Sequence, residues 1–341
     1  MLQQVMTAPG EIEIREVPVP EITEGEALVR IEKIGICGSD VHVYHGKHPF
    51  TKYPVTQGHE VSGVIEKLGK NVKGLRVGQK VTIEPQLVCG KCHPCRHGKY
   101  NLCEELKVIG FQAPGTARHF FAVDAAKVTP LPEGFSLEDG AMIEPMAVAV
   151  HAVKQAGDVR GKDIVVIGAG PIGNLVAQTA KGMGARQVMI TDVSDFRLGI
   201  AKECGIEACV NTTAEAFNDA MLRVFGPDKA DIIYDCAGNN ATMGQAIASA
   251  RKGSTIILVA VFAGMASIDL ALANDHELDI KSTMMYRHED YLDAIKLVED
   301  NHINLRALVS RRFPFREYLQ AYRYIDEHRE QTMKVIINVQ E

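Results

Sequence analysis

The chain has 341 residues, of which 46% are hydrophobic and 23% charged, and its formal net charge is −6. This length exceeds that of one ordinary hydrophobic core, so two domains are expected. No apolar run approaches the roughly 18 residues of a membrane span, and the acidic balance opposes nucleic-acid binding. The first residues lack the pattern of a signal peptide, so we expect a cytoplasmic protein with neither a membrane nor a nucleic-acid partner.

Short strands separated by glycine are the pattern of the first part of the chain. Residues 27–34 and 61–68 alternate between apolar and polar side chains, which is typical of half-buried strands. Gly69, Gly74 and Gly78 mark turns between such strands. These features predict an irregular β-rich domain over residues 1 to about 145.

Apolar β-branched runs alternate with helical stretches from Gly161 onward. Strands are predicted at 163–168, 187–192, 230–236 and 255–261, and a helix at 172–183. This alternation predicts a parallel sheet covered by helices on both faces. It fades after Lys281, and the apolar run 335–339 is a candidate to return to the first domain.

A glycine-rich loop follows the first of these strands and opens the predicted helix, with the sequence Gly168-Ala-Gly170-Pro-Ile172-Gly173. In a dinucleotide site the first glycine allows a tight turn, and the second lets the backbone approach a pyrophosphate. The third lets the helix pack closely on the strand, while the helix N-terminus offers free N–H groups. The loop therefore predicts a cofactor site that includes Ile172.

An acidic residue, Asp192, ends the next predicted strand, 24 residues after Gly168. A carboxylate there binds the ribose 2′-hydroxyl and repels a 2′-phosphate, so NAD is favoured over NADP. The alternative is a glycine turn with a solvated aspartate. Arg197 is expected either to stack on the adenosine or to be an ordinary surface arginine.

Four cysteines are bunched in one segment: Cys89, Cys92, Cys95 and Cys103. In a large chain without a secretion signal, such spacing indicates metal ligands, with a disulfide pair or a redox motif as the alternative. Four thiolates make a closed tetrahedral zinc site that leaves no position for water or substrate. The predicted role is structural, because the metal holds a loop with little apolar content.

A second set of ligand types comprises Cys37, His59, Glu60 and Glu144. A thiolate, an imidazole and a carboxylate form the mixed set that catalytic zinc uses, with room left for water or a substrate oxygen. Spacing alone leaves open the alternative that His59 and Glu60 are an ordinary surface pair.

The segment Gly58-His59-Glu60-Val-Ser-Gly63, with Gly69 and Val72 after it, resembles the zinc signature of the medium-chain alcohol dehydrogenases. The cysteine lobe and the glycine loop occur in that family's order and spacing, so the resemblance covers essentially the whole chain. It implies an α/β protein with a chaperonin-10-like β-rich catalytic domain and a Rossmann domain with a doubly wound parallel sheet. We expect the catalytic domain at 1–147 and 282–341, and the NAD-binding domain at 148–281.

The resemblance also implies the cofactors, which are NAD and two zinc ions, one structural and one catalytic. Cys37, His59 and Glu144 are expected to hold the catalytic zinc, with Glu60 as an exchangeable ligand. Glutamate at position 144 resembles the sorbitol (polyol) dehydrogenase branch, whereas the classical alcohol dehydrogenases carry a cysteine there. Whether Glu60 or Glu144 binds in the resting enzyme stays open.

The proton path is implied in the same way. Ser39 lies where the family keeps the hydroxyl that takes the substrate's proton, and His42 matches the histidine that passes it to solvent. Asp40 is expected to orient His59. The alternative for Ser39 and His42 is ordinary turn capping. The implied reaction is hydride transfer from a secondary alkoxide to NAD.

The substrate is open between a polyol and a sugar acid such as galactonate, gulonate or idonate. Tyr286 and Arg287 fall near the segment where sorbitol dehydrogenases carry a substrate-binding arginine and tyrosine, in reversed order. Several basic residues would suit a carboxylate, unless they are scattered surface charges. These are His45, Lys47, His48, Arg118, His119 and Arg287.

Two other functions stay open. One is an L-threonine 3-dehydrogenase or another secondary-alcohol dehydrogenase, and the other is a catalytically silent protein that binds zinc and NAD. The presence of Cys37, His59 and Ser39 favours an enzyme. A homodimer or homotetramer is the family norm and is expected here.

Overall fold

The chain leaves its first structural unit at Glu144 and returns to it at Val309 in the computed structural model, which describes residues 1–262 and 264–341. Unit 1 comprises Met1–Glu144 and Val309–Glu341, and unit 2 comprises Pro145–Leu308. Among the described residues, no helix is long and apolar enough to cross a membrane.

Antiparallel strands dominate unit 1. They are β1 (Leu2–Ala8), β2 (Glu11–Glu16), β3 (Glu26–Ile36), β4 (Glu60–Leu68), β5 (Lys80–Ile83), β6 (Gln86–Leu87), β7 (Lys107–Val108), β8 (Phe120–Asp124), β9 (Val128–Pro130), β16 (Val309–Pro314) and β17 (Lys334–Asn338). Seven of them form one sheet in the order β16-β17-β3-β4-β5-β9, with β8 also paired to β3. The predicted strands at 27–34 and 61–68 are therefore confirmed as β3 and β4.

Short helices accompany these strands. They are α1 (Gly38–Tyr44), α2 (His93–Arg96), α3 (Leu137–Ala141) and α11 (Tyr318–Glu327), and α4 (Ile143–Gln155) begins at the end of the first segment. Single 3₁₀ turns lie at Tyr100–Leu102, Ala125–Lys127, Phe315–Glu317 and Arg329–Gln331.

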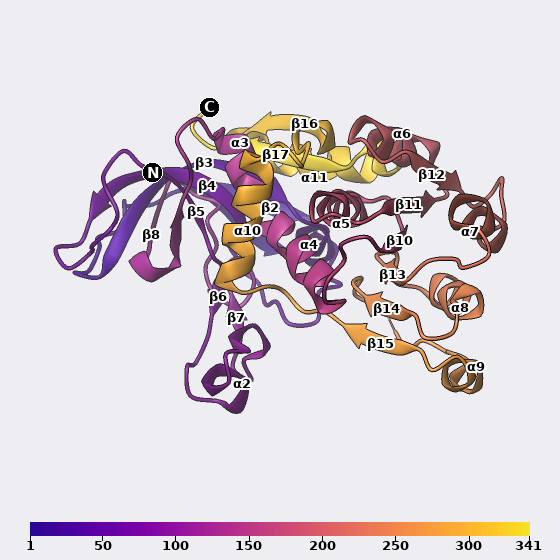
Figure 1. The fold of residues 1–341 in the computed structure, drawn as a ribbon. Coiled ribbons are helices and arrows are strands. Elements are labelled where there is room, and N and C mark those ends of the chain that lie inside the picture. Colours follow the sequence, from indigo (N-terminus) through magenta and orange to yellow (C-terminus); the bar gives the residue numbers. More distant parts are fainter. Residues whose placement is uncertain (263) are drawn as a thin grey trace. The chain divides into compact units, whose positions relative to one another are not determined.

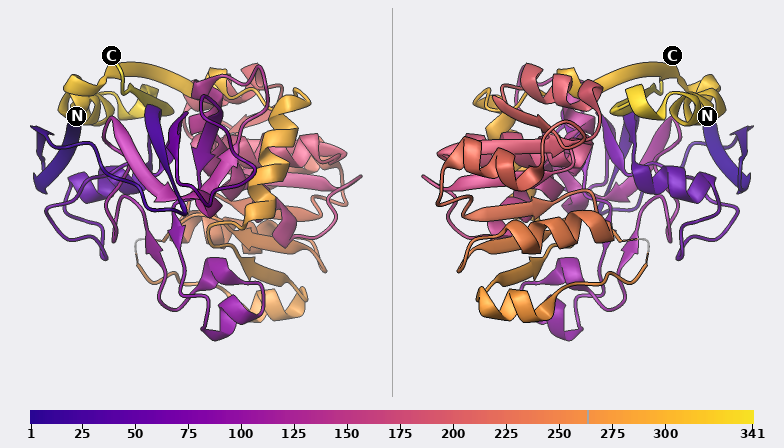
Figure 2. Two further views of the ribbon diagram at one scale, coloured as in Figure 1. Left: turned by 90° about the vertical axis from the view of Figure 1, so that its left-hand side faces the viewer. Right: turned by 90° about the vertical axis from the view of Figure 1, so that its right-hand side faces the viewer.

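The C-terminal strand β17 completes the sheet of unit 1, as the apolar run 335–339 predicted. Ile336 is paired with Gly35 of β3, and Gly35 is in turn paired with Glu60 of β4. Figure 2 shows the yellow C-terminal segment lying beside the indigo and violet strands in both views. Residues far apart in sequence therefore meet at the start of β4.

Unit 2 is a parallel sheet with the helices between its strands. The strands are β10 (Asp163–Ile167), β11 (Gln187–Asp192), β12 (Ala208–Asn211), β13 (Ile232–Asp235), β14 (Thr255–Leu258) and β15 (Asp279–Ser282). The helices are α4, α5 (Pro171–Gly182), α6 (Asp195–Glu203), α7 (Phe217–Phe225), α8 (Asn240–Ser249), α9 (Leu270–Asp275) and α10 (His288–Glu299), with a 3₁₀ turn at Arg306–Leu308. The strand order is β12-β11-β10-β13-β14-β15 (Figure 1).

Helices cover both faces of this sheet. Val165 and Ile233 pack in a cluster with Phe217 of α7 and Ile247 of α8. The next residue after Ile233, Tyr234, points to the other face, where its hydroxyl donates to a backbone oxygen of α4. Both alternating sets of side chains are buried in β10, β11, β13 and β14, so these strands have nearly continuous apolar runs, as the sequence indicated. The more exposed strands β12 and β15 were not predicted. The strand order changes direction between β10 and β13, and parallel sheets of this kind bind ligands at that position.

The second boundary lies later than the expected residue 282. The structure keeps α10 in unit 2, because Asp290 hydrogen-bonds to Nδ1 of His151 and accepts from Nζ of Lys154, both on α4 and both at 2.8 Å. Asn304 donates to Gln178 of α5 over 2.6 Å. The fading of strand and helix alternation after Lys281 therefore did not mark the end of the unit.

Candidate active site

Three of the predicted ligands converge at the junction of β3, α1 and β4. Ligand atoms of Cys37, His59 and Glu60 all lie within 4.8 Å of one another. Cys37 is the N-cap of α1, and the pairing of Gly35 with Glu60 brings the ends of the two strands together. His59 and Glu60 are buried, while Cys37 is half-buried. This mixed donor set fits zinc.

Asp40 connects the two segments that carry these ligands. Its Oδ2 accepts a hydrogen bond from the backbone N–H of Cys37 at 2.9 Å, and its Oδ1 lies 3.5 Å from Nδ1 of His59. Burial alone would lower the pKa of His59, but Asp40 and then Cys37 outweigh it and raise that pKa well above its usual value. Asp40 therefore lies where a partner of a metal-binding histidine is expected.

The carboxylate of Glu60 forms a buried ion pair with Lys334, a residue that the sequence did not indicate. Nζ of Lys334 lies 2.6 and 2.8 Å from the two carboxylate oxygens of Glu60, and both side chains are buried. A Cβ at Gly35 would lie 2.2 Å from Oε2 of Glu60, so any larger residue there would force this carboxylate to move. Burial opposes the charge on Lys334, but Glu60, Cys37 and Glu144 raise its pKa.

Glu144 is buried near the start of α4. Its carboxylate is close enough to Lys334 to affect the pKa of that lysine, but it is outside the group of three ligand atoms that lie together. The choice between Glu60 and Glu144 as ligand thus stays a prediction.

The two predicted proton-relay residues lie on α1 directly after Cys37. Ser39 is half-buried and His42 is exposed in the last turn of the helix. This order, from the metal ligand through a hydroxyl to an exposed imidazole, is compatible with a proton path to solvent. Their roles stay predictions.

The four-cysteine lobe forms a second cluster in unit 1. Ligand atoms of Cys89, Cys92, Cys95 and Cys103 lie within 4.8 Å of one another, and all eight cysteines of the chain are free thiols. Backbone hydrogen bonds lower the pKa of Cys92 to about 6, whereas burial and the neighbouring thiols raise that of Cys95 to about 12. Four thiols so close cannot all ionise without a cation to balance their negative charge. A structural zinc ion would be that cation.

The glycine loop in unit 2 has the geometry that the sequence predicted. Gly168 has φ +95°, and a Cβ at Gly173 would lie 1.8 Å from the backbone oxygen of Gly168. Gly170 is the N-cap of α5, and a Cβ there would meet nothing within 4 Å. The first and third glycines are thus required by packing, while the second leaves open space beside the helix N-terminus. Ile172, in the first turn of α5, is half-buried.

Asp192 lies at the end of β11 and holds this loop together. Its Oδ2 accepts from the backbone N–H of Ala169 at 2.7 Å, and its Oδ1 accepts from Val193 and Ser194 at 2.8 and 2.9 Å. Arg197 lies 3.8 Å from the same carboxylate. Asp192 thus has a structural role in addition to the predicted contact with ribose, which stays a prediction.

The predicted substrate residues are not part of either cysteine cluster. Tyr286 is fully buried in unit 2 with its ring 5.1 Å from Tyr291, and Arg287 is the N-cap of α10. Nε of Arg118 donates to the backbone oxygen of Gly115 at 3.1 Å. His119 packs against Phe315, with ring centroids 5.5 Å apart, and burial lowers its pKa.

Sequence reasoning missed several residues around His59. The ring of Phe111 lies 4.9 Å from His59 on one side and 4.9 Å from His48 on the other. Gln57 and Tyr322 are buried and hydrogen-bonded to each other. The only sequence signal at Tyr322 is the apolar spacing of α11, in which Tyr318, Ala321 and Tyr322 are buried, and such spacing indicates a core position rather than a site residue.

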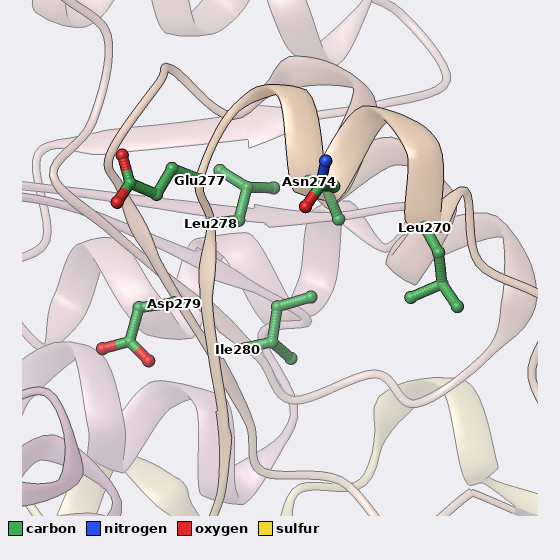
Figure 3. A pocket seen from close by; sticks show the side chains of 7 residues that line it. Leu270, Asn274, Glu277, Leu278, Asp279 and Ile280 are labelled. Atoms are coloured by element: carbon green, nitrogen blue, oxygen red, sulfur yellow. The ribbon is translucent and has the colours of Figure 1, made fainter.

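A separate pocket lies in unit 2 between α9 and β15 (Figure 3). Its lining residues are Leu270, Ala273, Asn274, Glu277, Leu278, Asp279 and Ile280. It contains no cysteine, no histidine and none of the predicted site residues, so it is not the candidate active site.

Comparison with known proteins defines the class. Residues 23–133 match the family model of the alcohol dehydrogenase GroES-like domain, and residues 171–300 match that of the zinc-binding dehydrogenases. The chain belongs to the zinc-binding alcohol dehydrogenase family, in its medium-chain polyol and sugar-acid branch.

Individual relatives support this assignment. Human sorbitol dehydrogenase is 34% identical over 94% of the chain and 91% of its own length. L-galactonate-5-dehydrogenase of Escherichia coli is 34% identical over 90% of the chain and 89% of its own length. The crystal structure of an Escherichia coli oxidoreductase of unknown specificity, 28% identical, matches all of this chain and 99% of that one with a TM-score of 0.95.

Proposed function

We propose that the chain transfers a hydride from a secondary hydroxyl of a polyol or sugar acid to NAD, giving the ketone. The observation that carries this proposal is the convergence of Cys37, His59 and Glu60 at the start of α1. The names of the relatives, sorbitol dehydrogenase and L-galactonate-5-dehydrogenase, support a substrate with several hydroxyls.

Separate residues are proposed for metal binding and for proton transfer. Cys37, His59 and either Glu60 or Glu144 would hold a zinc ion, which when bound supplies Lewis-acid polarisation of the substrate hydroxyl. Ser39 Oγ accepts the proton of that hydroxyl, and His42 passes it to solvent. The Cys89, Cys92, Cys95 and Cys103 thiolates would hold a second, structural zinc.

The glycine loop is the proposed NAD site. The open space at Gly170 would admit the pyrophosphate, and the free N–H groups of α5 would bind it. The carboxylate of Asp192 would repel a 2′-phosphate, which favours NAD over NADP. A nicotinamide cofactor held at this loop would supply the hydride acceptor.

Within the polyol and sugar-acid class, the charges near the metal cluster favour a neutral polyol. The carboxylates of Asp40, Glu60 and Glu144 and the zinc-bound thiolate of Cys37 would carry four negative charges, against three positive charges from Lys334 and the proposed zinc ion. Of the basic candidates, His45 is engaged by Asp326 at 2.9 Å. A substrate carboxylate would therefore add to an excess of negative charge.

His48 is the basic candidate best placed to contact the substrate. It stacks on Phe111, which in turn contacts His59, and its Nδ1 is hydrogen-bonded to Oγ1 of Thr51 at 2.8 Å. Burial lowers the pKa of His48, as do His42 and His59, although Asp40 opposes them. A neutral imidazole here suits a hydroxyl better than a carboxylate.

The proposal is tested by NADH formation with sorbitol, xylitol, L-galactonate, L-idonate, L-threonine and a simple secondary alcohol. We expect a polyol to have the highest kcat/KM. The Ser39→Ala variant should lose turnover and keep zinc and NADH binding, which separates chemistry from binding. Turnover of L-threonine alone would establish the alternative dehydrogenase, and binding of zinc and NADH without any turnover would establish a silent protein.

The compartment and assembly are also proposals. Eight free cysteines suit a reducing compartment, so the cytoplasm is proposed. A homodimer or homotetramer is proposed because β15 pairs only with β14 among the described residues, which leaves its other edge open, and Leu270 of α9 is 67% exposed. Light scattering after size-exclusion chromatography measures the assembly, and a monomeric mass would contradict it.

A further inference from the structure

A chain of buried polar side chains leads from helix α11 to the metal-binding cluster. The hydroxyl of Tyr322 donates to Oε1 of Gln57 at 2.6 Å, and Nε2 of Gln57 donates to Oδ1 of Asp40 at 3.2 Å. That same Oδ1 lies 3.5 Å from Nδ1 of His59. Each of these four residues is 5% exposed or less, so the contacts lie away from bulk solvent.

The direction of these hydrogen bonds orients Gln57. Because its Oε1 accepts from Tyr322, its Nε2 faces Asp40 and reaches both the side-chain oxygen and the backbone oxygen of that residue, each at 3.2 Å. This leaves Oδ2 of Asp40 to accept from the backbone N–H of Cys37. One carboxylate is thereby held between the segments that carry Cys37 and His59.

Helix α11 is fixed against α1 by further contacts. The ring of Tyr322 stacks on Tyr44 with centroids 4.8 Å apart, and Asp326 is paired with His45 at 2.9 Å. These contacts give the Tyr322 hydroxyl a defined position relative to the segment that begins with Cys37. The hydroxyl therefore acts from a rigid element, which is what the support of a metal ligand requires.

We propose that Tyr322 and Gln57 are positioning residues that hold Asp40, and through it the ring of His59, in the orientation that binds the catalytic metal. This inference rests on the proposed zinc site. Groups that orient a metal ligand typically change metal affinity by 10- to 100-fold. Tyr322 acts through two intermediates, so we expect roughly a fivefold effect, below that range.

The test is the rate of zinc release to a chromogenic chelator from the full-length protein loaded with two zinc ions. The wild type should release one zinc faster and one slower, because the four-thiolate site is closed. In Tyr322→Phe and Gln57→Leu, the faster phase should accelerate roughly fivefold while the slower phase is unchanged. The structural zinc thus serves as an internal control for folding.

Tyr318→Phe is the matched control. Tyr318 lies on the same helix, is 1% exposed and has its ring 6.0 Å from that of Tyr322, but it is not part of the hydrogen-bonded chain from Tyr322 through Gln57 to Asp40. This variant should release both zinc ions at wild-type rates. The double variant Tyr322→Phe/Gln57→Leu should match the stronger single variant, because both remove the same connection.

Unchanged faster phases in both Tyr322→Phe and Gln57→Leu would overturn the proposal, as would an equal effect of Tyr318→Phe. If Gln57→Leu fails to fold, Tyr322→Phe and its control carry the test alone. Zinc release needs no substrate, so a protein that oxidises nothing in the panel and still shows this pattern would refute the proposed function alone. Release of a single zinc per chain would argue against a catalytic zinc site, and both the proposed function and the positioning role depend on that site.

Discussion

At the scale of single residues, Lys334 is the side chain whose loss should most disturb the metal cluster. Its ammonium group is the buried partner of both Glu60 oxygens. In zinc-free Lys334→Met that carboxylate would stay buried without a cation, which costs about 3–5 kcal/mol of stability. Urea or thermal denaturation followed by circular dichroism should show the loss.

The control is Lys252→Met, which breaks a pair with Asp275 at 2.9 Å on a lysine whose side chain is 68% exposed. Exposed pairs contribute about 1 kcal/mol or less, so little should change. The double variant Lys334→Met/Glu60→Gln should recover part of the lost stability, since the unpaired charge is gone. Equal losses for Lys334→Met and Lys252→Met would contradict this account.

The sequence identified the residues whose types are unusual and missed those whose types are ordinary. Cys37, His59 and Glu60 were predicted because a thiol, an imidazole and a carboxylate at family spacing are specific. Lys334 and Tyr322 were not, because a lysine before an apolar strand and a tyrosine on an amphipathic helix are common. Their importance arises from contacts across 274 and 265 residues of chain, which no local pattern encodes.

At the scale of elements, the turn between β10 and α5 contains glycines that are needed for two different reasons, space for a ligand at Gly170 and close packing at Gly173. Gly170→Ala places its Cβ in open space on an ordinary backbone, so the free energy of unfolding should change by only about 0.5 kcal/mol. The added methyl group would occupy the proposed pyrophosphate position. NADH affinity, measured by fluorescence titration, should fall roughly tenfold, which corresponds to about 1.4 kcal/mol.

Gly173→Ala is the complementary variant. Its Cβ would lie 1.8 Å from the backbone oxygen of Gly168, so helix and strand must move apart. We expect a loss of about 1–3 kcal/mol of stability, visible as a lower midpoint of thermal unfolding. If Gly170→Ala binds NADH as the wild type does, the loop is not the cofactor site.

The contact between α4 and α10 gives unit 2 a pH dependence. Burial would raise the pKa of Asp290, but the hydrogen bonds from His151, Lys154 and the backbone of Arg287 lower it below its usual value of 3.8. A lowered pKa in the folded state contributes stability that is fully present above the unfolded pKa and lost as pH falls through the folded one.

Asp290→Asn should therefore be less stable than the wild type at neutral pH, by about 1–3 kcal/mol, because His151 and Lys154 lose a charged hydrogen-bond partner while Lys154 keeps Asp293. The difference should narrow as the pH falls below about 4, where the wild-type carboxylate also becomes neutral. Denaturant midpoints measured across this range provide the check. A difference that stays constant down to the lowest pH would mean that the charge of Asp290 is not what stabilises this contact.

At the scale of the whole molecule, the sequence predicted two domains and the return of the C-terminus, but not the extent of the inserted unit. The strands β10, β11, β13 and β14 were recognisable because both of their faces are buried, whereas the less buried β12 was not predicted. The segment from α10 to the turn at Arg306–Leu308 has no such run, and its attachment depends on single contacts such as Asp290 with His151. Tertiary contacts of this kind decide domain boundaries without leaving a periodic pattern.

The two units should also differ in how they respond to loss of metal. Between Cys89 and Cys103, only Asn101 and Cys103 are buried, so the lobe has almost no apolar core of its own. Without zinc it should unfold locally, because the metal replaces that missing core. Trypsin should then cut first after its exposed basic residues, which are Lys91, Arg96 and Lys99.

Limited proteolysis with and without a chelator, analysed by mass spectrometry, measures this directly. Unit 2 holds its own buried cluster and, among its described residues, no group of metal ligands, so its fragment should survive and keep the NADH affinity of the untreated protein. Cys103→Ser should reproduce the chelator's effect without any chelator, since it removes the buried ligand of the lobe. Cleavage that is equally fast with and without zinc, or that begins within residues 145–308, would show that the lobe does not depend on the metal.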